Sequence, residues 1–117
     1  MVRVSKTLTW NDCGVGRSHQ AGIHIPKETG KLLFIAIPDS IKNPKITIDL
    51  SAFGDGPLFQ TVITYYNSRK FGGTRDEYRL THIRNFLKDS SLKPGDDIFV
   101  EIDLETRLGT ISYKRQK

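Results

Sequence analysis

The sequence contains a single cysteine, Cys13, and no long run of apolar residues. One cysteine forms neither an internal disulfide nor a cysteine-based zinc site, so we expect a reducing, cytoplasmic location. No stretch of about 18 apolar residues is present, which excludes a transmembrane helix and gives no reason to expect a membrane partner. The N-terminal segment carries Arg3, Lys6, Asp12 and Arg17 where a signal peptide has an apolar stretch. The few histidines are scattered without metal-ligand spacing, so we expect no metal and no cofactor.

Size and charge limit the remaining possibilities. A chain of 117 residues predicts one domain, residues 1–117. The net charge is +5 and the isoelectric point is about 9.5. A basic balance favours an anionic partner, and nucleic acid is a more common one than a membrane surface.

Short segments of alternating apolar and polar residues dominate the chain and predict β-strands. The predicted strands cover residues 1–8, 21–25, 46–50, 59–66, 78–83, 98–104 and 108–113. A short helix is predicted over Lys27 to Phe34, although Gly30 weakens it, and a helical turn over Arg84 to Lys88. Seven or so strands with at most two short helices predict a mainly β (α+β) sandwich or barrel.

The segment Tyr65 to Arg79, YYNSRKFGGTRDEYR, interrupts this pattern. Apolar alternation stops at Asn67 and resumes near Leu80, so the segment is expected to project from the core. Its residue types suit DNA, because Arg matches guanine, Asn matches adenine and a carboxylate accepts from cytosine. A Gly pair permits a sharp turn. The alternative is a solvated, charged hairpin tip.

Two stretches together resemble a known family. They are Asn11 to Lys27, NDCGVGRSHQAGIHIPK, and Tyr65 to Arg79. Both are similar to segments of the N-terminal effector DNA-binding domain of EcoRII-like type IIE restriction endonucleases, which has the DNA-binding pseudobarrel of plant transcription factors. The resemblance implies a seven- to eight-stranded open pseudobarrel with one or two short helices, in a prokaryotic-type intracellular protein.

The resemblance also implies a binding site. Domains of this family clasp duplex DNA with two arms that enter the major groove and read a CCWGG-type site, where W is A or T. The first arm would hold Asn11, Asp12, Arg17, Ser18, His19 and Gln20. The second arm, residues 67–79, would hold Asn67, Ser68, Arg69, Lys70, Arg75, Asp76, Glu77, Tyr78 and Arg79.

Within the second arm, the resemblance assigns base reading to Arg69, Arg75, Glu77 and Arg79. Tyr78 and Gly73 stand where the family carries lysines, which leaves Tyr78 to donate one hydrogen bond or to pack on a thymine methyl group. Other interpretations remain open for several of these residues. Arg75, Glu77 and Arg79 also fit a surface ion-pair ladder, because residues two apart on a strand share a face.

Outside the second arm, Asn11 and Asp12 also fit plain turn formers. Trp10 is expected to be a packing anchor beside the first arm. His24 and His82 lie in strand-like runs, and we expect both to be structural.

Taken together, these features predict a sequence-specific double-stranded DNA-binding effector domain of a restriction endonuclease. The chain holds no nuclease motif, because the Glu101-x-Asp103 pair lacks a suitably spaced lysine. The catalytic nuclease domain is therefore expected outside this chain, as a partner in the full-length enzyme. The first alternative is a small β-barrel that binds a ligand or a protein and carries a basic loop. The second is a single-strand or RNA binder that stacks bases on exposed aromatic residues, here Tyr65, Tyr66, Phe71 and Tyr78.

Overall fold

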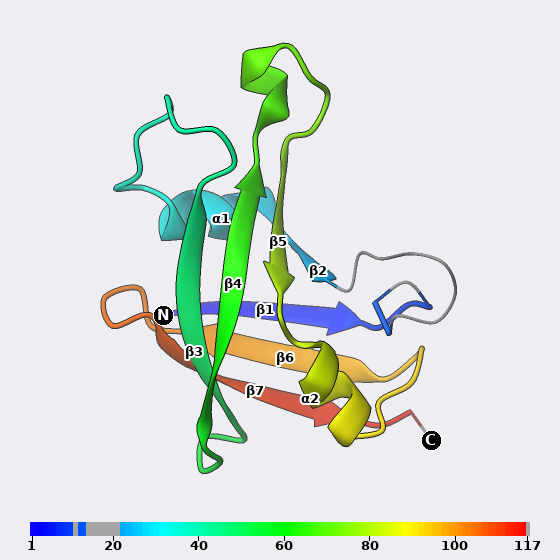
Figure 1. The fold of residues 1–117 in the computed structure, drawn as a ribbon. Coiled ribbons are helices and arrows are strands. Elements are labelled where there is room, and N and C mark those ends of the chain that lie inside the picture. The colour runs from blue at the N-terminus through cyan, green and yellow to red at the C-terminus, as the bar shows by residue number, and fades with distance from the viewer. Residues whose placement is uncertain (11, 14–21, 117) are drawn as a thin grey trace.

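The computed structural model describes residues 1–10, 12, 13 and 22–116, and these form one curled sheet of seven strands (Figure 1). The strands are β1 (Val2–Thr7), β2 (Gly22–Ile25), β3 (Lys45–Ala52), β4 (Leu58–Tyr66), β5 (Glu77–Thr81), β6 (Asp97–Ile102) and β7 (Leu108–Lys114). The helices are α1 (Lys27–Leu33), the 3-10 helix η1 (Ser68–Phe71) and α2 (Arg84–Asp89). The prediction of a mainly β pseudobarrel is confirmed, and the predicted strands and helices begin and end within two residues of the observed ones.

The strand order in the sheet is β1-β6-β7-β3-β4-β5-β2. Neighbouring strands are antiparallel except for β3 and β7, which are parallel. In Figure 1 the strands β3, β4 and β5 cross over the layer of β1, β6 and β7, so the sheet encloses its own core. The edge strands β1 and β2 leave this barrel open, as the family resemblance implied.

The core is built from the inward-facing half of each strand. Ile46, Ile48 and Leu50 alternate with more exposed residues on β3, and Ile98 and Val100 do the same on β6. Burial of apolar surface stabilises such a core by about 25 cal/mol per Å². The period of two therefore fixes which side chains of each strand face outward, including those of the candidate site.

Both short helices cover open parts of the barrel. α1 begins directly after Pro26, whose fixed φ suits a helix start, and buries Leu33. α2 buries Leu87, while Phe86 stacks on Phe59 at a ring distance of 5.6 Å. Among the helices of the described residues, none is long and apolar enough to cross a membrane.

The second arm leaves the sheet at the end of β4. Pairing between β4 and β5 ends at Tyr66 and Glu77, and the chain between them projects beyond the barrel (Figure 1). This confirms the predicted projection, whereas η1 was not predicted because its four residues carry no periodic pattern. Gly73 donates its N–H to the Ser68 carbonyl at 2.7 Å, and a Cβ at Gly73 would lie 2.7 Å from Ser68 Oγ. A lysine at position 73 would therefore not fit this tip unless Ser68 moved.

Gly30 explains how α1 packs on β5. A Cβ at this position would overlap the ring of Tyr78, which lies directly over the helix backbone. Tyr78 also contacts Phe34 at 5.3 Å and stacks on Tyr65 at 4.1 Å between ring centroids. The glycine therefore lowers helix propensity but admits an aromatic ring at the base of the second arm.

We expect Gly30→Ala to lower the free energy of unfolding by about 1–3 kcal/mol, because the added methyl group overpacks a filled space. Helix propensity alone would favour alanine, so the sign of the effect tests the packing. Lys31→Ala, at an exposed position on the same helix, is the matched control. Denaturant unfolding of both variants measures the difference, and a Gly30→Ala variant as stable as the native chain would contradict the packing explanation.

Candidate nucleic-acid interface

Side chains of three adjacent strands share one outward surface. Glu77 and Arg79 alternate with buried Tyr78 and Leu80 on β5, so both point outward. Tyr66 of β4 pairs with Glu77, and His24 of β2 pairs with Arg79. Cross-strand partners lie on the same side of a sheet. We call this surface, made of His24, Tyr66, Glu77 and Arg79 with the preceding Arg75, the outer face.

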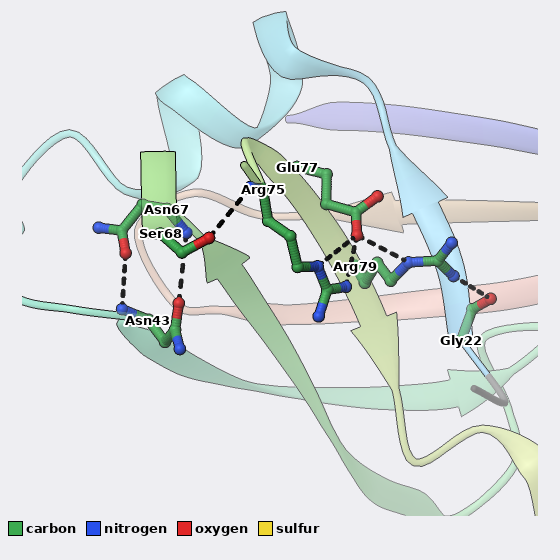
Figure 2. Close-up of polar contacts among 7 residues, drawn as sticks. All are labelled: Gly22, Asn43, Asn67, Ser68, Arg75, Glu77 and Arg79. Carbon is green, nitrogen blue, oxygen red and sulfur yellow. Dashed lines mark hydrogen bonds and ion pairs between the residues drawn. The ribbon is translucent and has the colours of Figure 1, made fainter. Parts of the chain in front are cut away.

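The centre of the outer face is one carboxylate between two guanidinium groups (Figure 2). Arg75 Nε donates to Glu77 Oε1 at 3.0 Å, and Arg75 Nη2 is also bonded to this oxygen. Arg79 Nε lies 3.6 Å from the same oxygen. The hydrogen bond from Arg75, and then the charge of Arg79, hold the pKa of Glu77 below its usual value, against partial burial, which raises it. The ion-pair ladder considered from the sequence is present in this ligand-free arrangement.

Further contacts fix the planes of the two guanidinium groups. The Arg75 guanidinium lies over the Tyr66 ring, 3.7 Å from its centroid. Arg79 Nη1 donates to the Gly22 carbonyl at 3.2 Å. Arg79 Nε is a buried donor without a hydrogen bond among the described residues, because Glu77 is beyond normal bonding distance. Both guanidinium groups are therefore held in place, and each keeps N–H donors that can bond another acceptor.

A second ionic cluster lies at the base of the second arm. The Tyr65 hydroxyl donates to Asp76 Oδ1 at 2.6 Å, and Lys27 Nζ lies 2.9 Å from Asp76 Oδ2. Arg69 Nη1 lies 3.7 Å from the same Oδ2. The hydrogen bonds from Tyr65 and then Lys27 lower the pKa of Asp76. Burial and then the hydrogen bond to Asp76 raise the pKa of Tyr65. Asp76 therefore ties the arm to α1 and β4, although the sequence interpretation placed it at the DNA.

Asn67 also has a different role from the one predicted. Its side chain is only 1% exposed, and its Oδ1 accepts the Asn43 N–H at 2.7 Å (Figure 2). Asn67 Nδ2 donates to the Ile41 carbonyl at 2.8 Å, and the Asn67 N–H donates to Asn43 Oδ1 at 3.3 Å. These bonds satisfy the polar groups of the turn where the loop before β3 meets the second arm. In this ligand-free arrangement the Asn67 amide is buried and bonded within the protein, so it is not presented to a base.

Tyr78 requires the same correction. The expectation was that it faces DNA, but only 4% of it is exposed and it packs in the stack with Tyr65 and Phe34. Alternation along β5 explains the difference, since Tyr78 lies between two outward residues. Its ring positions the arm from within.

The tip of the second arm carries its accessible charges. The Arg69 side chain is 69% exposed, and Lys70 Nζ pairs with exposed Asp39 at 3.1 Å. Ser68 Oγ accepts the Arg75 N–H at 3.0 Å, which closes the tip (Figure 2). Two cations are therefore presented beyond the sheet, while Ser68 supports the fold of the tip.

Most of the predicted first arm, namely Asn11, Arg17, Ser18, His19 and Gln20, lies outside the described residues. Asp12 is described and is 6% exposed. Its Oδ2 accepts the Thr9 N–H at 2.9 Å and lies 3.7 Å from Lys6 Nζ. Asp12 thus acts as a turn former in this ligand-free arrangement, and its carboxylate is bonded within the protein.

Sequence reasoning assigned the wrong environment to three other residues. His24 and His82 are both exposed, and His24 lies on the outer face, where its proximity to Glu77 helps to lower the pKa of that carboxyl. The alternation of His24 with buried Ile23 and Ile25 was a signal that could have revealed this position. Trp10 is 66% exposed, so it is not the packing anchor that was expected.

Comparison with known proteins identifies relatives of this arrangement. The family model described as "Restriction endonuclease EcoRII, N-terminal" matches residues 1–95. The type II restriction enzyme EcoRII of Escherichia coli is 39% identical over 79 residues, which are 65% of this chain and 19% of that enzyme. This chain thus spans about a fifth of the length of the curated relative it matches.

Two solved structures share the fold. An Arabidopsis FUS3–DNA complex superposes with a TM-score of 0.67 at 19% identity over 97% of both chains. A hypothetical protein of Arabidopsis thaliana gives a TM-score of 0.60 at 18% identity over 99% of this chain and 92% of that one.

We expect Asp76→Asn to lower the free energy of unfolding by about 1 kcal/mol at pH 7, because a charge-assisted pair becomes a neutral one on a partly exposed site. The folded pKa of Asp76 is lowered, so its stabilisation is present above the unfolded pKa and is lost as pH falls through the folded one. The difference in stability between the two proteins should therefore shrink as the pH falls through the folded pKa of Asp76. Urea unfolding over a pH series from neutral into the acidic range measures this, with Asp55→Asn in an exposed turn as control; a pH-independent difference would contradict the assignment.

Proposed function

Since the chain belongs to the EcoRII N-terminal family of restriction endonucleases, we propose that it is a sequence-specific double-stranded DNA-binding domain. In this proposal it serves as the effector or target-recognition domain of an intracellular restriction enzyme. It reads a CCWGG-type site in the major groove with two arms. It performs no cleavage and needs no cofactor, because catalysis belongs to a nuclease domain elsewhere in the full-length enzyme.

Two comparisons support this proposal. The FUS3 relative is in complex with DNA, and it shares this fold over nearly its whole length. The EcoRII relative is a restriction enzyme several times longer than this chain. A DNA-binding fold that forms a small part of a nuclease suits a recognition or effector role.

The observation that carries the proposal is the placement of Arg75 and Arg79 around Glu77. A guanidinium fork matches the O6 and N7 acceptors of guanine, and a carboxylate accepts from the cytosine amino group. All three groups lie on one outward surface, and their ion pairs and the Tyr66 ring fix them before any ligand arrives. Such preorganisation reduces the conformational entropy lost on binding.

Charges beside the outer face supply the second part of an interface. Arg69 and Lys70 project at the tip of the second arm, where phosphates of a duplex in the major groove would pass. Both are already paired with carboxylates. These pairs lie at the surface, where ion pairs contribute little stability and exchange readily. DNA phosphates can therefore replace Asp39 as the partner of Lys70.

The first test compares a duplex that contains CCWGG with a scrambled duplex of equal length and composition, near physiological salt. We expect the native chain to prefer the specific duplex by about a thousandfold or more, because base-edge contacts add to the shared phosphate contacts. Fluorescence anisotropy of labelled duplexes measures the ratio. Equal binding to both duplexes would contradict sequence-specific reading.

Separate variants test the roles of individual cations. Arg75→Ala or Arg79→Ala should reduce binding of the specific duplex by about 1–3 kcal/mol and affect the scrambled duplex less. Lys70→Ala should weaken both duplexes about equally, because a phosphate contact carries no base information. The same titrations measure all three, and circular dichroism confirms folding. If Arg75→Ala weakened both duplexes equally, Arg75 would be a phosphate contact only.

A further inference from the structure

A basic groove lies between α2 and the turn that follows β1, outside the outer face. It is lined among others by Trp10, Arg84, Asn85, Lys88, Lys93 and Pro94, and it has a volume of about 830 Å³. Its floor is the buried side of α2 around Leu87. This space is larger than one phosphate group requires, so it suits an extended ligand.

The charge of this groove is of one sign. Arg84, Lys88 and Lys93 line it and are exposed, and no carboxylate is among the described residues of the lining. Within the described part of the chain, none of these three cations has a carboxylate within 4.0 Å. Asp89 is exposed on α2 but does not line the groove. Asp96 of the loop before β6 accepts the Lys93 N–H and interacts with the charge of Lys93. The three exposed cations around one concave space are still complementary to a polyanion.

The aromatic wall of the groove adds a second feature. Trp10 is the only tryptophan in the chain and is 66% exposed. An indole ring with one apolar face and an N–H donor can contact a sugar and a phosphate together. Burial of this ring by a ligand would remove an exposed apolar surface that the fold leaves uncovered.

The position of the groove relates it to the outer face. β5 begins at Glu77 beside the second arm and ends at Thr81, three residues before Arg84. In Figure 1 the second arm projects from one end of the molecule, and α2 lies near the other end of β5. Five residues of strand span about 16 Å, and five base pairs span about 17 Å. A duplex that ran along β5 with a five-base-pair site on the outer face would therefore place its next phosphates beside α2.

We propose that the α2 groove binds the phosphodiester backbone of duplex DNA that flanks the recognised site, with Arg84, Lys88 and Lys93 as phosphate contacts and Trp10 as the wall. This rests on the proposed function, because it assumes a duplex on the outer face. The groove then extends the binding site beyond the bases that are read, and it contributes affinity without sequence information.

The duplex backbone suits this groove better than a single strand does. A single-strand site uses several aromatic rings in a row to stack successive bases, whereas Trp10 is the one aromatic residue of the described lining. The cations come from two parts of the chain, α2 and the loop before β6, and both parts line the groove. A backbone that passes between them contacts both sides.

Trp10 provides a direct measurement of groove occupancy. We would titrate the native chain with three duplexes that contain CCWGG and carry about two, about six or about twelve flanking pairs on each side, at a temperature where the shortest stays double-stranded, and record tryptophan emission and affinity. The longer duplexes should change Trp10 emission and bind about tenfold more tightly than the shortest one, with a steeper salt dependence.

The test variant is Arg84→Ala/Lys88→Ala. It should bind all three duplexes with similar affinity, and its salt slope on the long duplex should be about two smaller in magnitude than that of the native chain. The control is Arg3→Ala/Arg107→Ala, which removes the same charge from exposed positions on β1 and in the β6–β7 turn. The control should keep the dependence on flank length and the change in emission.

The outcomes separate this inference from the proposed function. A native chain that prefers CCWGG but shows neither a flank-length effect nor a change in Trp10 emission would overturn the groove and leave specific binding intact. A chain without preference for CCWGG would overturn the proposed function, while a flank effect lost only in Arg84→Ala/Lys88→Ala would still support the groove. A larger emission change with a single strand of equal length than with the duplex would overturn the duplex-backbone assignment.

Discussion

The stack of Tyr78 on Tyr65 is the contact on which the candidate interface depends. It joins β5 to β4 at the base of the second arm, and Gly30 of α1 leaves room for it. The Tyr65 hydroxyl then bonds Asp76, which also holds Lys27 and Arg69. Because a packed stack is close to incompressible, these contacts set where the arm leaves the sheet. The outward neighbours of Tyr78, Glu77 and Arg79, acquire their positions from the same strand.

This arrangement divides the second arm into residues that support its shape and charged groups that remain at the surface. Asn67, Ser68, Asp76 and Tyr78 satisfy bonds or pack within the protein, so their polarity or aromatic character serves the shape of the arm. Arg75, Glu77 and Arg79 remain at the surface in a mutually restrained geometry. Restraint is valuable for arginine, because its long side chain otherwise loses much rotamer freedom on binding. A rigid scaffold that carries a few fixed forks is suited to recognition of planar base edges.

The strands could be predicted because their apolar residues recur with a period of two. The first helix, α1, could be predicted because it follows Pro26. The same period of two places His24 outside and Tyr78 inside, and along β5 it outweighs the polar character of the neighbouring residues. Trp10 shows a limit of prediction from residue type. Its large apolar ring indicates burial by composition, yet the residue is 66% exposed. Propensity describes a side chain, whereas exposure depends on what packs against it.

The sequence by itself determined the fold class, the projecting segment and the residue types suited to nucleic acid, since periodicity and side-chain chemistry are local properties. Only the tertiary structure decided which polar residues of that segment are free. Asn67 meets Asn43 from a loop more than twenty positions earlier, and Asp76 meets Lys27 from a helix still farther away. The groove between Trp10 and α2 is also made by segments distant in the chain. Contacts of this kind arise from how strands pair and curl, and a reading of local pattern contains no information about them.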